Sequence, residues 1–319
     1  MMRPTNRATF LMGTVAAAVA GLPCRLRAQT APPLTTIRLG TAGNDDATPI
    51  VYAQKAGIFA KYGLDVQINK SPGPAAAALV GGSYDFGKAA ITTLLQAHEN
   101  GLPLTLVAGA SVENFNVPYA AFLMKKESPA QSGKDFEGKL IGLVALQGIG
   151  EVAMKKFVDE NGGDPKLLTF IEVPTFTAAG SVDTGRVYAS ECTYPAIQVG
   201  LDSGRMKTAE FYRELGSGSV LTAWSVKREF SASHPDIVRA FARAWREAST
   251  YTNAHHSATV DMMAEFTAIP ADVIAKMPRA TATPTLAPAQ LQTMIDVCAK
   301  YGALKTRFAA ADFIDPNIR

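Results

Sequence analysis

The chain has 319 residues, of which 47% are hydrophobic and 18% are charged. This composition is too apolar for a disordered chain, and the length suffices for two lobes of ordinary size. A formal charge of +3 leaves nucleic-acid or membrane-surface binding open until the charges are located. Three cysteines exclude a disulfide-rich scaffold, and four histidines offer little material for a metal cluster, so we expect no cofactor.

The first residues are typical of an export signal. Arg3 and Arg7 precede an uncharged run at 10–22, which is shorter than the about 20 residues of a membrane-spanning helix. We therefore predict a signal peptide at 1–28, cleaved after Ala28 and followed by a periplasmic protein. A buried N-terminal helix is the alternative, but Pro32-Pro33 breaks the chain without a cap. Sec export is favoured over the twin-arginine route, because one of the paired arginines is missing.

Removal of this signal changes the charge. Residues 1–28 hold four of the 31 basic residues and no acid, which leaves 27 bases against 28 acids, a net charge of −1. The basic character thus belongs to the leader. Nucleic-acid binding loses its main support.

The mature chain begins with alternating strands and helices. Hydrophobic periodicity predicts strands at 36–40, 65–69, 85–87 and 104–108, and helices at 47–62, 74–80 and 92–100. Gly63 is expected to end the first helix as a C-cap. This alternation predicts a parallel, doubly wound sheet.

A second series of elements follows Pro118. Strands are expected at 119–124, 140–144, 167–173, 187–192 and 207–211, with a helix at 150–161. The polar segment 212–218 ends in glycine and serine, as a boundary between lobes would. From Pro235 onward the pattern is almost entirely helical, with one apolar face through Phe241 and Trp245.

Four segments resemble solute-binding proteins of ABC importers. They are GIFAKYGLDV at 57–66, GSYDFG at 82–87, DFEGKLIG at 135–142 and HPDIVRAF at 234–241. Together they span most of the mature chain in the expected order. The resemblance is to the nitrate, sulfonate, taurine and thiamine-pyrimidine-precursor branch.

This resemblance implies an α/β, two-lobe periplasmic binding protein fold of type II, which closes on its ligand by a hinge. Each lobe would be a doubly wound, mostly parallel sheet, with a helical C-terminal part. The first lobe would comprise 29–117 and the returning segment 222–319, and the second lobe 118–221. The expected partners are a small-molecule ligand and the membrane permease of the importer, and we expect a monomer.

Polar residues that follow the strands of the first lobe are candidates for ligand contact. Asn44 and Asp45 follow the first strand, although acids at a helix start also favour the helix. Thr92 could cap its helix, bind ligand or do both. Asn116 lies near the expected crossing between the lobes.

The second lobe offers a second set of candidates. Gln147 and Gly148 precede a helix, where backbone N–H groups could hold an acidic group, or where glycine serves only a tight turn. The resembled family has an aspartate where Tyr188 stands, so we favour Glu191 and Tyr194 for ligand contact. Trp224, near the return crossing, could provide a packing wall for the ligand or pack within the hinge.

Binding without catalysis is the function that we expect. The acids favour a ligand that bears donor groups, such as a zwitterionic sulfonate, a taurine-like solute or an aminopyrimidine, over bare nitrate. The alternative is an enzyme on the same scaffold, resembling a desulfinase or a pyrimidine-precursor synthase, with Cys192 or Cys298 as a reactive nucleophile. The same two cysteines could form a disulfide or remain free. A sensory role in place of delivery to an importer is a third possibility.

Overall fold

The computed structural model describes residues 33–70 and 75–318. The predicted signal peptide lies outside these residues. Within the described ranges, no helix is long and apolar enough to cross a membrane. The chain from Leu34 onward forms one compact unit.

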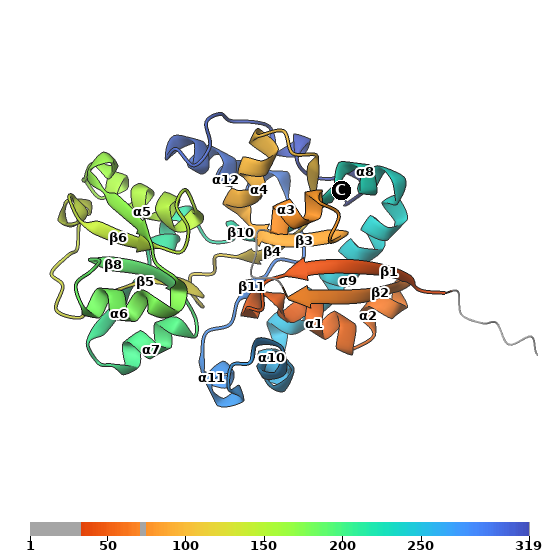
Figure 1. The fold of residues 1–319 in the computed structure, drawn as a ribbon, viewed down its shortest axis with the longest axis horizontal. Helices are drawn as coiled ribbons and strands as arrows, with labels where there is room; N and C mark the ends of the chain where they lie inside the picture. Colours follow the sequence, from red (N-terminus) through yellow and green to blue (C-terminus); the bar gives the residue numbers. More distant parts are fainter. Residues whose placement is uncertain (1–32, 71–74, 319) are drawn as a thin grey trace, which may run out of the picture. The chain divides into compact units, whose positions relative to one another are not determined.

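The first of two sheets joins strands from both ends of this unit (Figure 1). Its six strands run in the order β11-β4-β10-β3-β1-β2. They are β1 (Thr35–Thr41), β2 (Leu64–Lys70), β3 (Phe86–Ala90), β4 (Leu104–Val112), β10 (Val220–Lys227) and β11 (Thr281–Ala282). The late strand β10 therefore lies between two early ones, which ties the returning chain to the N-terminal series.

The second sheet is built from the middle of the chain. Its five strands run in the order β7-β6-β8-β5-β9. They are β5 (Ala120–Lys125), β6 (Leu140–Leu143), β7 (Thr169–Glu172), β8 (Ala189–Thr193) and β9 (Met206–Ala209).

Both sheets are mixed, and all of the antiparallel pairs except β4–β11 have a common cause. The pairs β1–β2, β1–β3, β6–β7 and β6–β8 are parallel, as the strand–helix alternation predicts. The strands next to the two crossings, β5 and β10, are antiparallel to their neighbours, because each enters its sheet from the other one. Periodicity within a segment carries no information on this direction.

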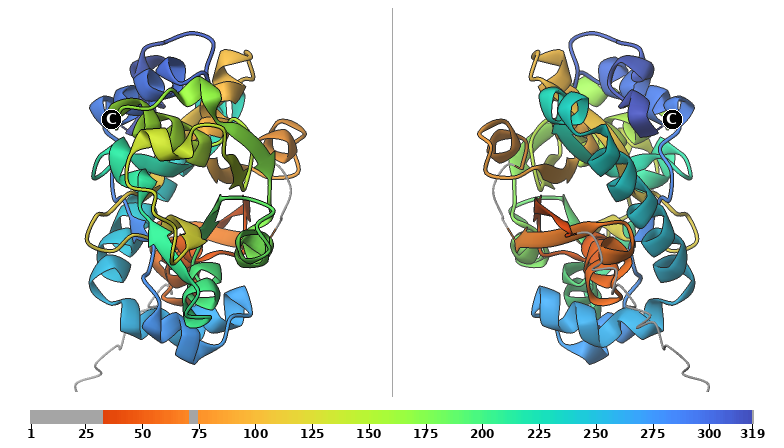
Figure 2. Two further views of the ribbon diagram at one scale, coloured as in Figure 1. Left: turned by 90° about the vertical axis from the view of Figure 1, so that its left-hand side faces the viewer. Right: turned by 90° about the vertical axis from the view of Figure 1, so that its right-hand side faces the viewer.

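Helices cover both faces of each sheet. The first sheet has α1 (Thr48–Lys55), α2 (Ile58–Lys61) and α9 (Pro235–Ala254) on one face, and α3 (Ala75–Val80), α4 (Ile91–Glu99) and α12 (Pro288–Lys300) on the other. The second sheet has α5 (Ile149–Glu160) on one face, and α6 (Ala178–Asp183) and α7 (Ala196–Asp202) on the other. Shorter helices α8 (Arg228–Ser233), α10 (Val260–Thr267) and α11 (Ala271–Lys276) follow the return crossing. Figure 2 shows the long helix α9 running obliquely across the first sheet.

Two local predictions need correction. The helix expected at 47–62 is divided into a 3-10 turn at Asp45–Ala47, α1 and α2, because Gly57 has a φ of +71° and ends the regular helix. Thr92 is not an N-cap, since α4 begins at Ile91 and Ala90 occupies the cap position. Several described elements were not predicted: the strands β10 and β11 and the helices α6, α7 and α8. The predicted strands, and the other predicted helices, agree with the described ones to within a few residues.

Candidate functional site

A buried ion pair lies at the carboxyl end of the first sheet. The Lys88 ammonium on β3 donates to Asp46 Oδ1, and both side chains are 3% exposed. Thr222 Oγ1 on β10 donates to Asp46 Oδ2 at 3.0 Å and lies 2.7 Å from Ser111 Oγ on β4. Lys88 also donates to Asn44 Oδ1 at 3.2 Å. Two strands, β3 and β10, thus each bring a donor to the Asp46 carboxylate, and Ser111 and Asn44 contact those donors in turn.

Asp45 forms a second buried pair beside the first. Arg279 Nε donates to Asp45 Oδ1 at 2.7 Å, and the Ala280 N–H donates to Oδ2 at 2.7 Å. The Arg279 side chain is 5% exposed. We call Asp45, Asp46, Lys88 and Arg279 the paired-charge cluster, in which two acids balance two bases. Because each carboxylate is paired with a base, Asp45 and Asp46 add no net negative charge here and lend no support to the expected preference for a ligand with donor groups.

Glu191, on β8 of the second sheet, is a third buried acid. Its carboxylate accepts from the Val144 N–H at 2.8 Å and from the Tyr212 hydroxyl. Gly150, in the first turn of α5, makes room for it, because a Cβ there would approach the Glu191 carboxylate to 2.4 Å. Burial raises the pKa of Glu191, although both hydrogen bonds act in the opposite direction.

Gln147 and Gly148 form the turn that leads into α5. Gln147 has a φ of +56°, and its N–H donates to Glu151 Oε2 at 2.7 Å. Its carbonyl accepts a hydrogen bond from Gln96 Nε2 of α4 at 3.1 Å. This bond connects a helix that covers the first sheet to the turn before α5, which covers the second. Gly148 is needed for space, since a Cβ would lie 2.7 Å from the Ala145 carbonyl oxygen. The glycine thus serves a tight turn, and Gln147 lies at a contact between the two halves.

Tyr194 also bridges the two halves. It packs against the side chains of the second sheet and against a separate apolar group formed by α1, α10 and α11. Its N–H donates to the Tyr119 carbonyl at 3.2 Å. Tyr119 is buried near Asp45 and Asp46, and its burial raises the pKa of its phenol well above the usual value.

Glu113 is a buried carboxyl group at the crossing between the sheets. It is 2% exposed, and its Oε1 has no hydrogen-bond partner among the described residues. Its backbone pairs with the return segment, through Glu113 N to Ser219 O at 2.9 Å and Gly218 N to Glu113 O at 2.8 Å. Burial and the neighbouring Glu210 raise its pKa to about 7, while Arg213 acts to lower it.

The other predicted contacts lie in different surroundings. Thr92 is 2% exposed in the first turn of α4. Asn116 is exposed, and its N–H donates to Asn114 Oδ1 at 3.0 Å. Trp224 is a core residue and not a ligand wall: it is 0% exposed and packs edge-on against Phe241 and Trp245 of α9. Trp224 is buried because β10 pairs with β3 inside the sheet, where Trp224 lies opposite Lys88.

Sequence reasoning missed Lys88, Thr222, Arg279 and Glu113. A signal existed for Lys88, because a lysine within the apolar strand Phe86–Ala90 needs a buried acid, and Asp45-Asp46 offered one. No comparable signal pointed to Arg279, which approaches Asp45 from a distance of 234 residues along the chain.

The cysteines are poor candidates for a nucleophile. Cys192 and Cys298 are free and buried, and they lie in different apolar clusters. Burial raises the pKa of each thiol to about 12, so little thiolate forms at neutral pH. Among the described residues, no group of three or more His, Cys, Asp or Glu side chains could hold a metal ion.

Two mixed sheets that place polar residues at the ends of their parallel strands define an α/β fold of the periplasmic binding protein class. Solved structures share this fold. The alkanesulfonate-binding protein SsuA from Xanthomonas axonopodis, bound to MOPS, is 18% identical, with a TM-score of 0.70 over 89% of this chain and 99% of that one. The nitrate-binding protein NrtA from Synechocystis is 16% identical, with a TM-score of 0.74 over 90% of this chain and 88% of that one.

The chain belongs to the NMT1/THI5-like family, whose match covers residues 44–258. A relative from Schizosaccharomyces pombe, a 4-amino-5-hydroxymethyl-2-methylpyrimidine phosphate synthase, is 28% identical over 72% of this chain and 67% of its own length. These matches confirm the resemblance to the nitrate, sulfonate and thiamine-precursor branch.

The expectation that the protein is not an enzyme is contradicted. The relative from S. pombe is named as a synthase. The desulfurization enzyme DSZB also shares the fold, at 11% identity and a TM-score of 0.62 over 89% of this chain and 97% of that one. Proteins that resemble this chain in sequence or in fold thus include named enzymes, and the fold alone does not separate binding from turnover.

Proposed function

We propose that this protein is the exported ligand-binding component of an ABC importer and captures a small polar organic solute with an aminopyrimidine-like ring. The ligand would lie between two lobes, 29–117 with 222–319 and 118–221, and the protein would reside in the periplasm as a monomer. Of the predicted contacts, Gln147, Glu191 and Tyr194 are those that we retain for this role, with Asn44 from the first lobe.

The charge balance of the paired-charge cluster carries this choice of ligand. A sulfonate or nitrate needs positive charge that is not already neutralised. Lys88 and Arg279 are both buried, and each is paired with an acid. A neutral heteroaromatic ring needs no such charge. In an aminopyrimidine the amine donates a hydrogen bond and the neighbouring ring nitrogen accepts one, which matches the acceptor and donor of a protonated carboxyl group. Burial of Glu191 favours this protonated form.

Catalysis on a related substrate is the second candidate function, and the synthase relative supports it. In this case the same residues would hold the substrate while a group near them moves a proton. Glu113 is suited to such a step by its pKa of about 7. The buried thiols are not suited to it, so we expect slow alkylation of Cys192 and Cys298 in the folded protein.

A thermal-shift titration followed by mass spectrometry of the recovered ligand tests both functions. The probes are 4-amino-5-hydroxymethyl-2-methylpyrimidine, taurine, hexanesulfonate and nitrate. At about 100 times its dissociation constant, the bound probe should add about 2.7 kcal/mol to the free energy of unfolding. We expect this increase for the aminopyrimidine, and the mass of the recovered ligand distinguishes binding alone from turnover.

Glu191→Gln should weaken binding of the aminopyrimidine by about tenfold or more. A carboxyl group can carry its proton on either oxygen, whereas in the glutamine amide the donor and the acceptor cannot exchange places. Glu160→Gln, at the exposed end of α5, is the matched control and should bind as the parent does. A shift with sulfonates alone would contradict the ligand class. If mass spectrometry shows that the aminopyrimidine has been converted to a product of different mass, the protein is an enzyme and the proposal of binding alone is wrong.

A further inference from the structure

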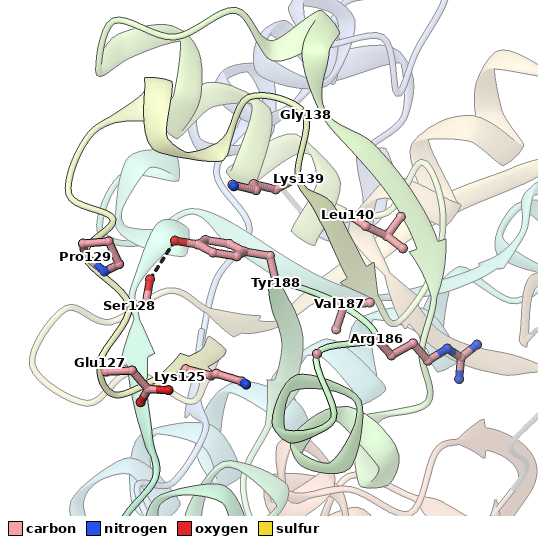
Figure 3. Close-up of a pocket in the computed structure, with 11 residues that line it drawn as sticks. Lys125, Glu127, Ser128, Pro129, Gly138, Lys139, Leu140, Arg186, Val187 and Tyr188 are labelled. Atoms are coloured by element: carbon pink, nitrogen blue, oxygen red, sulfur yellow. Dashed lines mark hydrogen bonds between the residues drawn. The ribbon is translucent and has the colours of Figure 1, made fainter.

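A pocket lies at the opposite end of the second sheet from Glu191 (Figure 3). Its volume is about 410 Å³, and it is lined by the turn after β5, the residues before β6 and the residues before β8. Because β6 and β8 run in parallel away from it, the candidate site at their carboxyl ends is separated from this pocket by roughly 10–15 Å of strand. The proposed function therefore does not use it.

Tyr188 forms an aromatic wall of this pocket and is held in place. Its hydroxyl lies 2.7 Å from Ser128 Oγ, and its ring packs edge-on against Phe136 with centroids 5.6 Å apart. Leu140, Val187 and Pro129 add apolar surface around it. A ring that is fixed on one edge and open to the pocket is suited to stacking against a flat ligand.

Two lysines beside this ring lack acidic partners. Lys139 Nζ lies 5.2 Å from the centroid of the Tyr188 ring, and Lys125 extends on the other side of it in Figure 3. No ion pair of the described chain includes Lys125 or Lys139. Glu127 is the one acid in the lining, whereas the guanidinium of Arg186 is directed away from the ring.

Glu137 and Asp135 are the acids nearest to Lys139 along the chain, and both accept hydrogen bonds from backbone N–H groups. Glu137 Oε1 accepts from the Asp164 N–H at 2.9 Å. Asp135 accepts from the N–H groups of Gln131 and Ser132 and from the Ser132 hydroxyl, at 2.7–2.9 Å. These bonds hold its loop. Asp135 and Lys139 attract each other without forming an ion pair. With three basic residues and one acid in its lining, the pocket keeps a net positive charge next to an aromatic face.

We infer that this pocket binds a small aromatic dianion, whose ring lies against Tyr188 and whose two acidic groups face Lys125 and Lys139 respectively. Tyr188 stands where the resembled family has an aspartate. The inferred site gives this tyrosine a role, because an aspartate in its place would repel an anionic ligand. The pocket is thus a second ligand site, and Tyr188 is its aromatic wall.

Glycine-selective ¹⁵N NMR of the protein, titrated with isophthalate, tests this inference. Gly138 and Gly185 line the pocket, whereas Gly148 and Gly150 report on the candidate site at the start of α5. We expect saturable shifts of Gly138 and Gly185 with Gly148 and Gly150 unchanged. Cyclohexane-1,3-dicarboxylate and benzamide, which lack the aromatic ring and the charge respectively, should bind more weakly by about tenfold.

Matched variants distinguish a built site from non-specific attraction. Tyr188→Phe keeps the ring and should retain affinity within about twofold, while Tyr188→Asp should abolish the shifts. Lys125→Gln and Lys139→Gln, both at exposed or half-exposed positions, should each weaken binding by about tenfold without loss of folding. Shifts that are absent at Gly138 and Gly185, or unchanged in Tyr188→Asp, would overturn the inference.

Discussion

Glu113 is the residue for which burial and charge make the clearest prediction. Its pKa of about 7 in the folded protein lies above the ordinary value of 4.5. The folded state therefore binds the proton more tightly, and the free energy of unfolding falls as the pH rises from about 4.5 to about 7. Glu113→Gln should remove this fall and be more stable than the parent by about 1–3 kcal/mol at pH 8. Urea unfolding at a series of pH values measures it.

Glu229→Gln provides the control for that experiment, because Glu229 is exposed on α8 and carries a carboxyl of the same kind. It should keep the pH dependence of the parent. A Glu113→Gln protein whose stability falls equally between these pH values would show that another group is responsible.

The Lys88–Asp46 pair makes the second prediction at this scale. Asp46→Asn leaves the Lys88 ammonium buried without its carboxylate, which typically costs about 3–5 kcal/mol. The exposed i,i+4 pair Lys156–Glu160 is the matched control, and Glu160→Gln should leave stability within the error of the parent. Guanidinium unfolding distinguishes the two. A loss below about 1 kcal/mol for Asp46→Asn would mean that water reaches Lys88.

At the scale of elements, Gly57 determines where α1 ends and α2 begins. Its φ of +71° lies in the left-handed region, so Gly57→Ala should destabilise the protein by about 1 kcal/mol although nothing blocks the added methyl group. Gly180→Ala, in an exposed position of α6 with equally open space, should instead stabilise by about 0.5–1 kcal/mol. Thermal unfolding of both variants gives the comparison, and equal effects would contradict it.

The elements also show what the sequence could predict and what it could not. Strands such as β2 and β4 were predictable, because apolar periodicity and flanking glycines are local signals. The antiparallel insertion of β10 was not, since it depends on how the chain returns after 100 residues in the other sheet. Trp224 was misplaced for this reason: its neighbours Phe241 and Trp245 become known only once β10 lies beneath α9.

At the scale of the molecule, the two halves are joined on one side by α5 and the end of α12. Asp159 Oδ2 accepts from Lys300 Nζ at 2.9 Å and from the Tyr301 hydroxyl at 2.8 Å. Lys155 Nζ donates to the Tyr301 carbonyl at 3.2 Å. These contacts join residues 141–146 positions apart, so neither helix alone reveals them. They connect the two halves on this side of the molecule.

Asp159→Asn should weaken this connection, because the amide replaces a charged acceptor for both Lys300 and Tyr301. We expect a larger radius of gyration by small-angle scattering in the absence of ligand. Under the proposed hinge closure, the apparent affinity for the aminopyrimidine should fall by about two- to tenfold, because the closed state becomes less populated. Asp272→Asn, which removes an exposed acid of α11 with only a loose contact to Lys276 at 3.9 Å, is the control. Unchanged scattering and affinity in Asp159→Asn would show that the α5–α12 contact does not govern closure.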